Sequence, residues 1–200
     1  MSAVATAEPS LARAVHFPPV GQCVKLRPID PRDADVLQAY VRGLSPESRH
    51  DRFFVALYEL PQTELQCVTH LDGKYELALL AETCVDGALI VIGEARYAFA
   101  PDRLESEFAL SVADNWRGKG LGTLLMADIE CRVRSLGAEH LCGDVLYSNE
   151  PMKALARKKG FRMAGVPRDA KLVRIVKDLA LSRGAGSSGR ATASNLPIAA

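Results

Sequence analysis

Between residues 20 and 180 the hydrophobic positions recur with two periods, one of two residues and one of three to four. The shorter period predicts strands at residues 24–26, 75–83, 88–98, 107–112, 141–147 and 172–176. The longer period predicts helices that begin near residues 31, 46, 61, 121 and 150. Strands interrupted by helices in this order indicate an α+β domain built on a sheet of mixed strand direction.

Capping residues support the predicted helix boundaries. Asp30 followed by Pro31 is typical of a helix start, and Ser45 followed by Pro46 repeats the device. Gly137 is typical of a helix end and closes the long helix that begins at Leu121. The apolar stripe of the first helix is predicted to be Val36, Leu37, Tyr40, Val41 and Leu44.

The two ends of the chain differ from its middle in composition. Residues 1–19 are rich in Ala, Ser and Pro, and residues 181–200 are dominated by Gly, Ala, Ser and small polar residues. Such segments bury too little apolar area to offset the entropy of ordering, so both are predicted to be disordered. One folded domain is therefore expected at residues 20–180.

Charge and cysteine content narrow the functional classes. The formal net charge of +1 argues against a nucleic-acid partner, and no apolar run predicts a signal peptide or a membrane partner, so we expect a cytoplasmic protein. The cysteines are odd in number and lack the spacing of a zinc site, so no metal is expected. They are predicted to be reduced, buried thiols: Cys23, Cys67, Cys84, Cys131 and Cys142.

A glycine-rich turn at residues 117–122 joins a predicted strand to the long helix. Glycines let the backbone turn tightly and approach a ligand, and the first turn of the helix offers unpaired N–H groups to an anion. The spacing fits neither Gly-x-x-x-x-Gly-Lys-Ser/Thr nor Gly-x-Gly-x-x-Gly. The sequence therefore predicts an anion-binding loop that is neither a P-loop nor a dinucleotide-binding loop.

Arg117, Gly120 and Gly122 fit the pattern Arg/Gln-x-x-Gly-x-Gly/Ala, which resembles motif A of the GNAT acetyltransferases. The segment from Asn149 to Gly160 and Phe161 is similar to motif B of the same family. Residues 26–33, 44–54, 107–109 and 154–161 resemble the catalytic domain of bacterial Pat-type protein lysine acetyltransferases, and the resemblance extends over residues 22–178. Pat enzymes join this domain to a large synthetase-like region, for which 200 residues leave no room.

The resemblance implies a GNAT fold, with a central mixed, mostly antiparallel sheet flanked by helices, and acetyl-CoA as cosubstrate. In this family the glycine-rich loop binds the pyrophosphate, the backbone of the preceding strand binds the pantetheine and thioester, and the motif B asparagine contacts the coenzyme. The cofactor-binding residues implied are Leu110, Val112, Arg117, Gly118, Lys119, Gly120, Leu121, Gly122 and Asn149. Asn149 would cap a helix in addition.

Attack on a thioester requires a neutral amine, and a lysine with a pKa of ~10.4 loses its proton near pH 7 at a cost of about 4.6 kcal/mol. Strand alternation places Glu107 with the small residues Ala109 and Ser111 on one face, which leaves room beside the carboxylate. Glu107 also matches the general base of Pat-type domains. It is the catalytic candidate, acting directly or through a water, with Glu94 in reserve.

Many GNAT enzymes carry a tyrosine acid seven residues after the motif B asparagine, and this chain has Ala156 there, as Pat-type domains do. A thiolate with a pKa near ~8.5 is a good leaving group, so the loss is tolerable. Tyr147 and Ser148 are weak alternative candidates for the general acid. By the family's layout Arg49, Arg52, Phe53 and Phe54 belong to the acceptor side, where both phenylalanines are expected to pack.

The sequence thus predicts an N-acetyltransferase that moves the acetyl group of acetyl-CoA directly to an amine. Protein lysine, as on an acyl-CoA synthetase, is the leading acceptor by resemblance. A small-molecule amine and a non-catalytic acyl-CoA-binding regulatory module are the alternatives.

Overall fold

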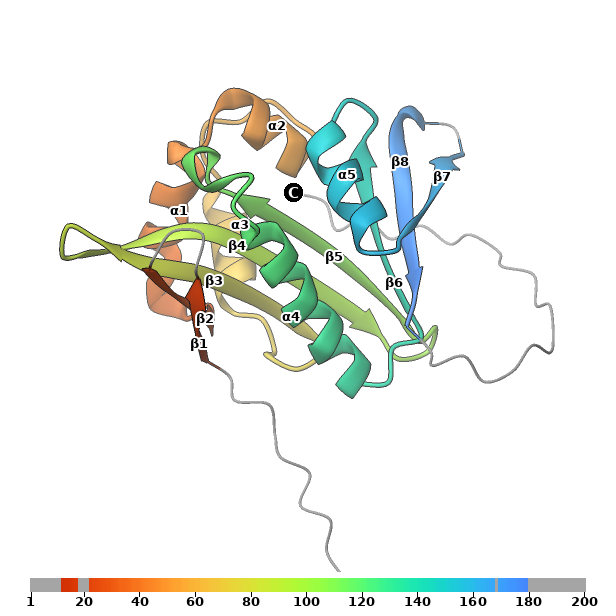
Figure 1. Cartoon of the computed structure of the whole chain (residues 1–200), viewed down its shortest axis with the longest axis horizontal. Coiled ribbons are helices and arrows are strands. Elements are labelled where there is room, and N and C mark those ends of the chain that lie inside the picture. Colours follow the sequence, from red (N-terminus) through yellow and green to blue (C-terminus); the bar gives the residue numbers. More distant parts are fainter. Residues whose placement is uncertain (1–11, 18–21, 168, 180–200) are drawn as a thin grey trace, which may run out of the picture.

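The computed structural model describes residues 12–17, 22–167 and 169–179. Within these residues the chain forms one eight-stranded sheet in the order β1-β2-β3-β4-β5-β6-β8-β7, flanked by helices (Figure 1). The strands are β1 Arg13–Phe17, β2 Gln22–Pro28, β3 Glu76–Val85, β4 Ala88–Ala100, β5 Glu105–Val112, β6 His140–Leu146, β7 Arg162–Val166 and β8 Asp169–Asp178. The α-helices are α1 Ala34–Gly43, α2 Pro46–Phe53, α3 Gln62–Thr69, α4 Leu121–Ser135 and α5 Glu150–Lys158, with 3-10 turns at Pro31–Asp33 and Asp114–Trp116.

All neighbouring strands in the sheet are antiparallel except β5 and β6, which are parallel. The predicted α+β class and the mixed, mostly antiparallel sheet are therefore confirmed. The parallel pair requires a crossover, which α4 supplies.

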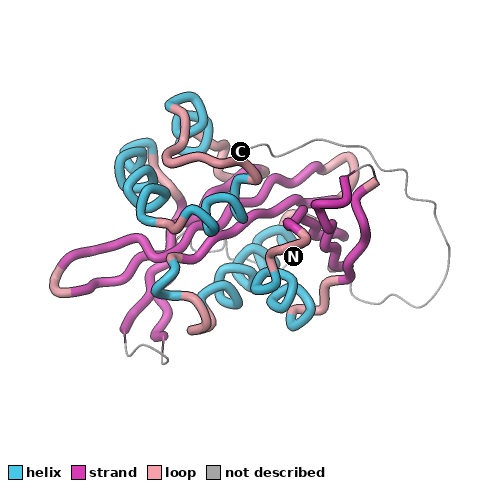
Figure 2. Tube along the Cα trace, turned by 90° about the horizontal axis from the view of Figure 1, so that it is seen from above, coloured by secondary structure: helices cyan, strands magenta, loops and turns pink. Residues whose placement is uncertain are grey.

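Helices cover both faces of the sheet, as the view from above shows (Figure 2). On one face α4 packs its fully buried side chains Leu125, Met126 and Ile129 into a core shared with the strands. On the other face α1 and α3 enclose a second cluster that includes Leu37, Val41, Leu65, Val68 and Leu80. Each fully buried Leu or Ile contributes roughly 1.5–3 kcal/mol relative to an exposed one, so these two clusters hold the helices in place.

Several sequence-based boundaries need correction. Residues 1–19 were predicted to be disordered, but residues 13–17 form a strand paired with β2. Residues 1–11, 18 and 19 and the C-terminal residues 180–200, which include the predicted tail, lie outside the described part of the chain. Two prolines after residue 17 obscured the short strand pattern. β7 was not predicted, because only five residues with three of them exposed carry no clear alternation.

The predicted stripe on α1 is correct for Leu37, Tyr40, Val41 and Leu44, which are buried. Val36 is an exception, because its side chain lies at the exposed edge of the helix. No helix within the described residues is long and apolar enough to cross a membrane.

Candidate active site

The sheet opens between its two parallel strands. The β5–β6 pairing covers only Glu105 to Glu107 on β5, and it ends where Glu107 lies opposite Cys142. Gly143 follows at the apex of the opening, where an added Cβ would lie 2.8 Å from the Phe108 carbonyl oxygen. Real Cβ atoms do not approach an oxygen this closely, so only glycine fits at the point where the strands part.

The main chain of β5 faces this opening beyond the last strand pair. Because the Phe108 carbonyl is directed at Gly143 on β6, strand alternation directs the main-chain groups of Leu110 and Val112 to the same side. Past Glu107 no β6 residue pairs with them within the described chain. The main-chain N–H groups of Leu110 and Val112, the strand residues that the resemblance implies for coenzyme binding, therefore face the opening.

A cleft of about 690 Å³ occupies the opening. Its walls come from α2, β5, the glycine-rich loop with the first turn of α4, and from β6, α5 and β8. Figure 1 shows α2 and α5 at the open end, where β5 and β6 separate. The predicted site residues that line it are Glu107, Leu110, Val112, Arg117, Gly118, Gly120, Leu121, Gly122 and Asn149.

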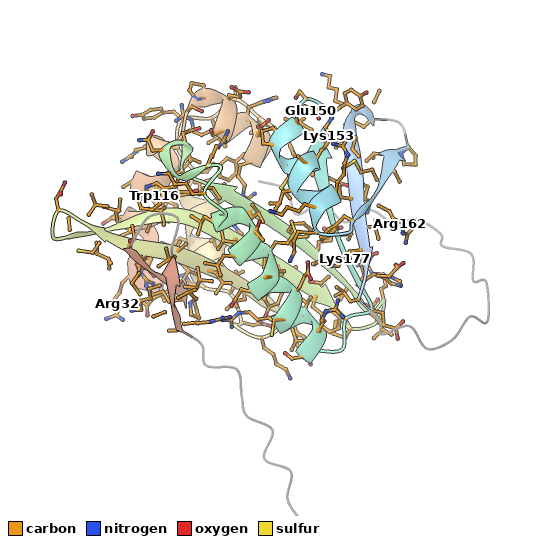
Figure 3. The ribbon with its side chains drawn as sticks, in the orientation of Figure 1. Arg32, Trp116, Glu150, Lys153, Arg162 and Lys177 are labelled. Carbon is orange, nitrogen blue, oxygen red and sulfur yellow. The ribbon has the colours of Figure 1, made fainter. Side chains whose placement is uncertain are left out.

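Lys119 is the predicted site residue that does not line the cleft. Its ammonium lies 4.9 Å from the centre of the Trp116 ring, a cation–π distance, and Figure 3 shows Trp116 on the segment before α4. Side-chain direction in a glycine-rich loop follows from its torsion angles, which a motif does not reveal. A role for the Lys119 side chain in the cleft is not supported.

The start of α4 has the features of an anion site. Gly120 is the N-cap residue with a φ of 94°, and no side chain caps the helix. Leu121, Gly122 and Thr123 of the first turn line the cleft. Their N–H groups lack partners within the helix, and the positive end of the helix dipole adds to them.

Arg117 and Asp114 connect the loop to the N-terminus of α2. Arg117 Nη2 donates to Ser48 Oγ at 2.7 Å, and Asp114 accepts hydrogen bonds from the Ser45 N–H at 2.9 Å and from the Ser48 hydroxyl. Burial raises the pKa of Asp114, but the bonds from Ser48 and Ser45 and the charge of Arg117 outweigh it and hold the pKa below its ordinary value. This network was not predicted, because its partners are 66 to 69 residues apart along the chain.

Glu107 lies half-buried in the cleft wall, and its carboxylate is hydrogen-bonded to Arg174 on β8 at 2.9 Å. Arg174 also donates to Asp144 at 3.2 Å, to Glu105 at 3.4 Å and to the Cys142 sulfur at 3.1 Å. One guanidinium thus fixes three carboxylates at the apex of the opening. Arg174 was missed from the sequence, because it belongs to a strand that reaches the site only through the sheet order.

Glu105, Glu107 and Cys142 place their potential metal ligand atoms within 4.8 Å of one another. Arg174 is hydrogen-bonded to all three, so a positive charge already lies against them. Burial raises the pKa of the Cys142 thiol, which keeps it protonated.

Glu94, the reserve candidate for the base, is buried outside the cleft. Its carboxylate is paired with Arg52 at 3.2 Å and with Arg96, and its exposed fraction is 1%. Burial raises the pKa of Glu94, but the charges of Arg52 and Arg96 dominate and hold it below the ordinary value. Glu94 therefore serves as the centre of a buried ion-pair network and is not positioned as a base.

Two weak candidates for the general acid are also outside the cleft. Tyr147 is exposed, and the Lys153 ammonium lies 4.4 Å from its ring centre. Figure 3 shows Lys153 beside Glu150 on α5, to which it donates at 2.5 Å. Neither Tyr147 nor Ser148 is among the lining residues, and Ala156 is fully buried in the core.

Asn149 caps α5, because its side-chain oxygen accepts from the Met152 N–H at 2.9 Å.

On α2, Arg49 donates hydrogen bonds to main-chain carbonyls, including that of Leu57 at 2.8 Å, and is structural. Phe53 is buried as expected, whereas Phe54 is 38% exposed and lines the cleft, so the prediction that both pack was wrong for Phe54.

The predicted burial was wrong for four of the five cysteines. Cys142 is buried, but Cys23, Cys67, Cys84 and Cys131 are exposed, and all five are free. Apolar neighbours in sequence do not indicate that a cysteine is buried, because adjacent side chains point to different sides of a strand or helix.

Comparison with known proteins identifies the family. A family model described as the acetyltransferase (GNAT) family matches residues 40–161. The acetyltransferase PA5475 of Pseudomonas aeruginosa is 28% identical over 141 residues, which cover 70% of this chain and 76% of that protein. The GNAT domain of S. lividans PAT has a TM-score of 0.75 and 26% identity over 86% of this chain and 99% of that domain. An N-acetyltransferase from Staphylococcus aureus Mu50 shares the fold, with a TM-score of 0.60 and 20% identity over 78% of this chain and 99% of its own. The chain therefore belongs to the GNAT family and is an acetyl-CoA-dependent N-acetyltransferase.

Proposed function

We propose that this enzyme transfers the acetyl group of acetyl-CoA directly to the side-chain amine of a protein lysine, with Glu107 as the base. The observation that carries the proposal is one continuous cleft that runs from the uncapped start of α4 to the Glu107 carboxylate. It joins an anion site to a proton acceptor along the free main chain of β5.

The phosphate end of acetyl-CoA binds at the glycine-rich loop in this proposal. N–H groups of residues 118–122 donate to the pyrophosphate, and Arg117 adds a positive charge. Asn149, on the opposite wall, contacts the coenzyme while it caps α5.

The thioester lies along β5. Main-chain N–H groups of Leu110 and Val112 hold the pantetheine amides and the thioester oxygen, on which negative charge develops as the amine attacks. Because these donors are fixed by strand pairing with β4, little reorganisation is needed during the reaction.

Glu107 takes the proton from the lysine ammonium, directly or through one water. Arg174 holds the carboxylate oxygen toward the apex of the opening. The neutral amine attacks the thioester carbon and a C–N bond forms, the nitrogen then releases its second proton to solvent, and the C–S bond breaks. The departing CoA thiolate takes its proton from solvent, since a thiol pKa near ~8.5 makes the thiolate a stable leaving group.

The acceptor class rests on two supports. The GNAT domain of S. lividans PAT is similar over 99% of its length at 26% identity. In addition, carboxylates of Asp51, Glu107 and Asp144 line the cleft, and with only Arg174 paired to two of them the remaining negative charge suits a cationic substrate.

The test is an intact-mass screen with acetyl-CoA. Acyl-CoA synthetases would be compared with a panel of polyamines and amino sugars, and we expect a mass gain of one acetyl group on a synthetase. Acetylation of small amines alone would contradict the lysine acceptor. For the base, Glu107→Gln is expected to lower the rate about 10²–10⁴-fold without changing the acetyl-CoA affinity. An unchanged rate with every active acceptor would remove Glu107 from that role.

A further inference from the structure

Phe54 and Val55 form an exposed apolar rim on the cleft. They follow α2 directly, their exposed fractions are 38% and 50%, and both line the cleft. Their neighbour Phe53 is 3% exposed and belongs to the core beneath α2. Core packing therefore accounts for Phe53 but not for the two residues that follow it.

The backbone of Phe54 is held in an unfavourable conformation. Phe54 is the C-cap of α2 with a φ of 63°, in the left-handed region that glycine adopts without cost. Its N–H donates to the His50 carbonyl at 2.8 Å, which fixes it there. A bulky residue in such a conformation at a site rim indicates that its side chain has a use that glycine would not provide.

The rim lies on the same side of the sheet as Glu107. Tyr40 of α1 is hydrogen-bonded to Ser111, and Arg52 of α2 is paired with Glu94 opposite Ser111. Glu107 shares this face of β5 by alternation, whereas α4 covers the other face. An amine that approaches Glu107 from this face meets α2 and the residues that follow it.

The charges around this part of the cleft favour a cation. Asp51, Glu107 and Asp144 contribute carboxylates to the lining, and the single positive charge of Arg174, which is bonded to Glu107 and Asp144, balances only part of their negative charge. Among the cationic lining residues, Arg52 is paired with Glu94, Arg117 is bonded to Ser48 at the loop, and Lys158 is the last residue of α5. A polypeptide that offers a lysine with an apolar neighbour matches both the carboxylates and the rim.

We propose that Phe54 and Val55 are a docking rim for the polypeptide acceptor, which packs an apolar side chain next to its target lysine on these two residues. This inference rests on the proposed function, and it narrows the acceptor from any lysine to a lysine in an apolar context. A free small amine has no group to place on the rim.

The test compares two peptides of equal length that carry one lysine, followed by Leu in one and by Ser in the other. The wild-type enzyme is expected to have a kcat/KM about tenfold higher for the Leu peptide, through a lower KM, which corresponds to one apolar contact of ~1.4 kcal/mol. Phe54→Gly and Val55→Ser are expected to remove most of this preference. Phe54→Gly relieves the left-handed backbone, and Val55→Ser leaves the cap residue intact, so a folding defect does not confound both.

Leu89→Ser is the matched control, because Leu89 is 64% exposed at the tip of the β3–β4 hairpin and does not line the cleft. It is expected to keep the preference and the rate. If the wild-type enzyme had equal kcat/KM for the two peptides, or if both rim variants kept the preference, this inference would be overturned while the proposed function would stand. A self-association of the wild type that Phe54→Gly abolishes in sedimentation would assign the rim to a second copy and also overturn it. If neither peptide were acetylated while a small amine was, the proposed lysine acceptor would fail first.

Discussion

Arg174 is the residue on which the position of Glu107 depends. Its guanidinium bonds Glu107, Glu105, Asp144 and Cys142, so its loss would leave the Glu107 carboxylate free to turn. We expect Arg174→Ala to lower kcat about tenfold to a hundredfold with little change in acetyl-CoA affinity, since small misplacements of a reacting group are costly. Steady-state kinetics with a calorimetric binding measurement would check this.

A double-mutant cycle separates positioning from a general structural effect. If Arg174 acts through Glu107, Arg174→Ala should add almost nothing to Glu107→Gln. Arg174→Lys is expected to recover part of the rate, because it keeps the charge but loses the fork geometry. Arg162→Ala is the control, since Arg162 on the neighbouring strand forms an exposed ion pair with Asp178. Additive losses in the cycle would contradict the positioning role.

Sequence reasoning selected Glu107 from strand alternation and its small neighbours, which are local properties, together with the resemblance to Pat-type domains, and the structure places it in the cleft wall. It did not find Arg174, whose relation to Glu107 exists only once β8 pairs with β6. It also assigned Phe54 to packing, since hydrophobicity alone does not reveal a left-handed backbone.

At the scale of elements, Gly143 determines how closely β5 and β6 meet. An alanine there would place its Cβ against the Phe108 carbonyl and ring, so Gly143→Ala should force the strands apart. We expect a loss of about 1–3 kcal/mol in the free energy of unfolding, typical of overpacking. Denaturant unfolding would measure it. Gly43→Ala is the control, because nothing lies within 4 Å of its Cβ at the end of α1, and it should be neutral or stabilising. Equal effects of the two changes would contradict this account of the apex.

The link between α2 and the glycine-rich loop should depend on pH. The pKa of Asp114 is lower in the folded protein than its usual value of ~3.9, so the ionised group stabilises the fold above about pH 4 and this is lost as the pH falls through the folded pKa. Solvent screening at this partly exposed site limits the effect to about 1 kcal/mol. Asp114→Ala should lower the melting temperature at pH 7, and the difference in melting temperature between the variant and the wild type should become smaller below pH 4. Asp102→Ala, at an exposed loop residue, should show no gap at either pH.

Element boundaries were predictable where capping residues and long periodic segments coincide, as for α4 from Leu121 and its termination at Gly137. The strand partners were not predictable, because a period of two residues fixes which side chains share a face but not which strand lies alongside. The splay between β5 and β6 is therefore a property of the sheet. The GNAT motifs indicated it only through the resemblance.

At the scale of the whole molecule, the sheet has two parts, β1–β5 and β6, β8 and β7. The strand pairing that joins them consists of three residue pairs between β5 and β6. Acetyl-CoA bound in the cleft would contact both parts, through β5 and the loop on one side and through α5 on the other. Binding should therefore stabilise the junction as well as the site. At a ligand concentration of 100 times Kd, linkage gives about 2.7 kcal/mol, which corresponds to a rise in melting temperature of about 5–10 °C.

Hydrogen exchange would locate this stabilisation. We expect acetyl-CoA to slow exchange in the first turn of α4, along Leu110 to Val112 where the main chain faces the opening, and in β6 and α5 across it. β1 and β2 lie at the far edge of the same sheet and provide an internal control, with exchange expected to stay unchanged. Protection confined to the start of α4 would mean that the coenzyme binds by its phosphates alone. The β5 main chain would then not be the thioester site, and the placement of the acetyl group beside Glu107 would be lost with it.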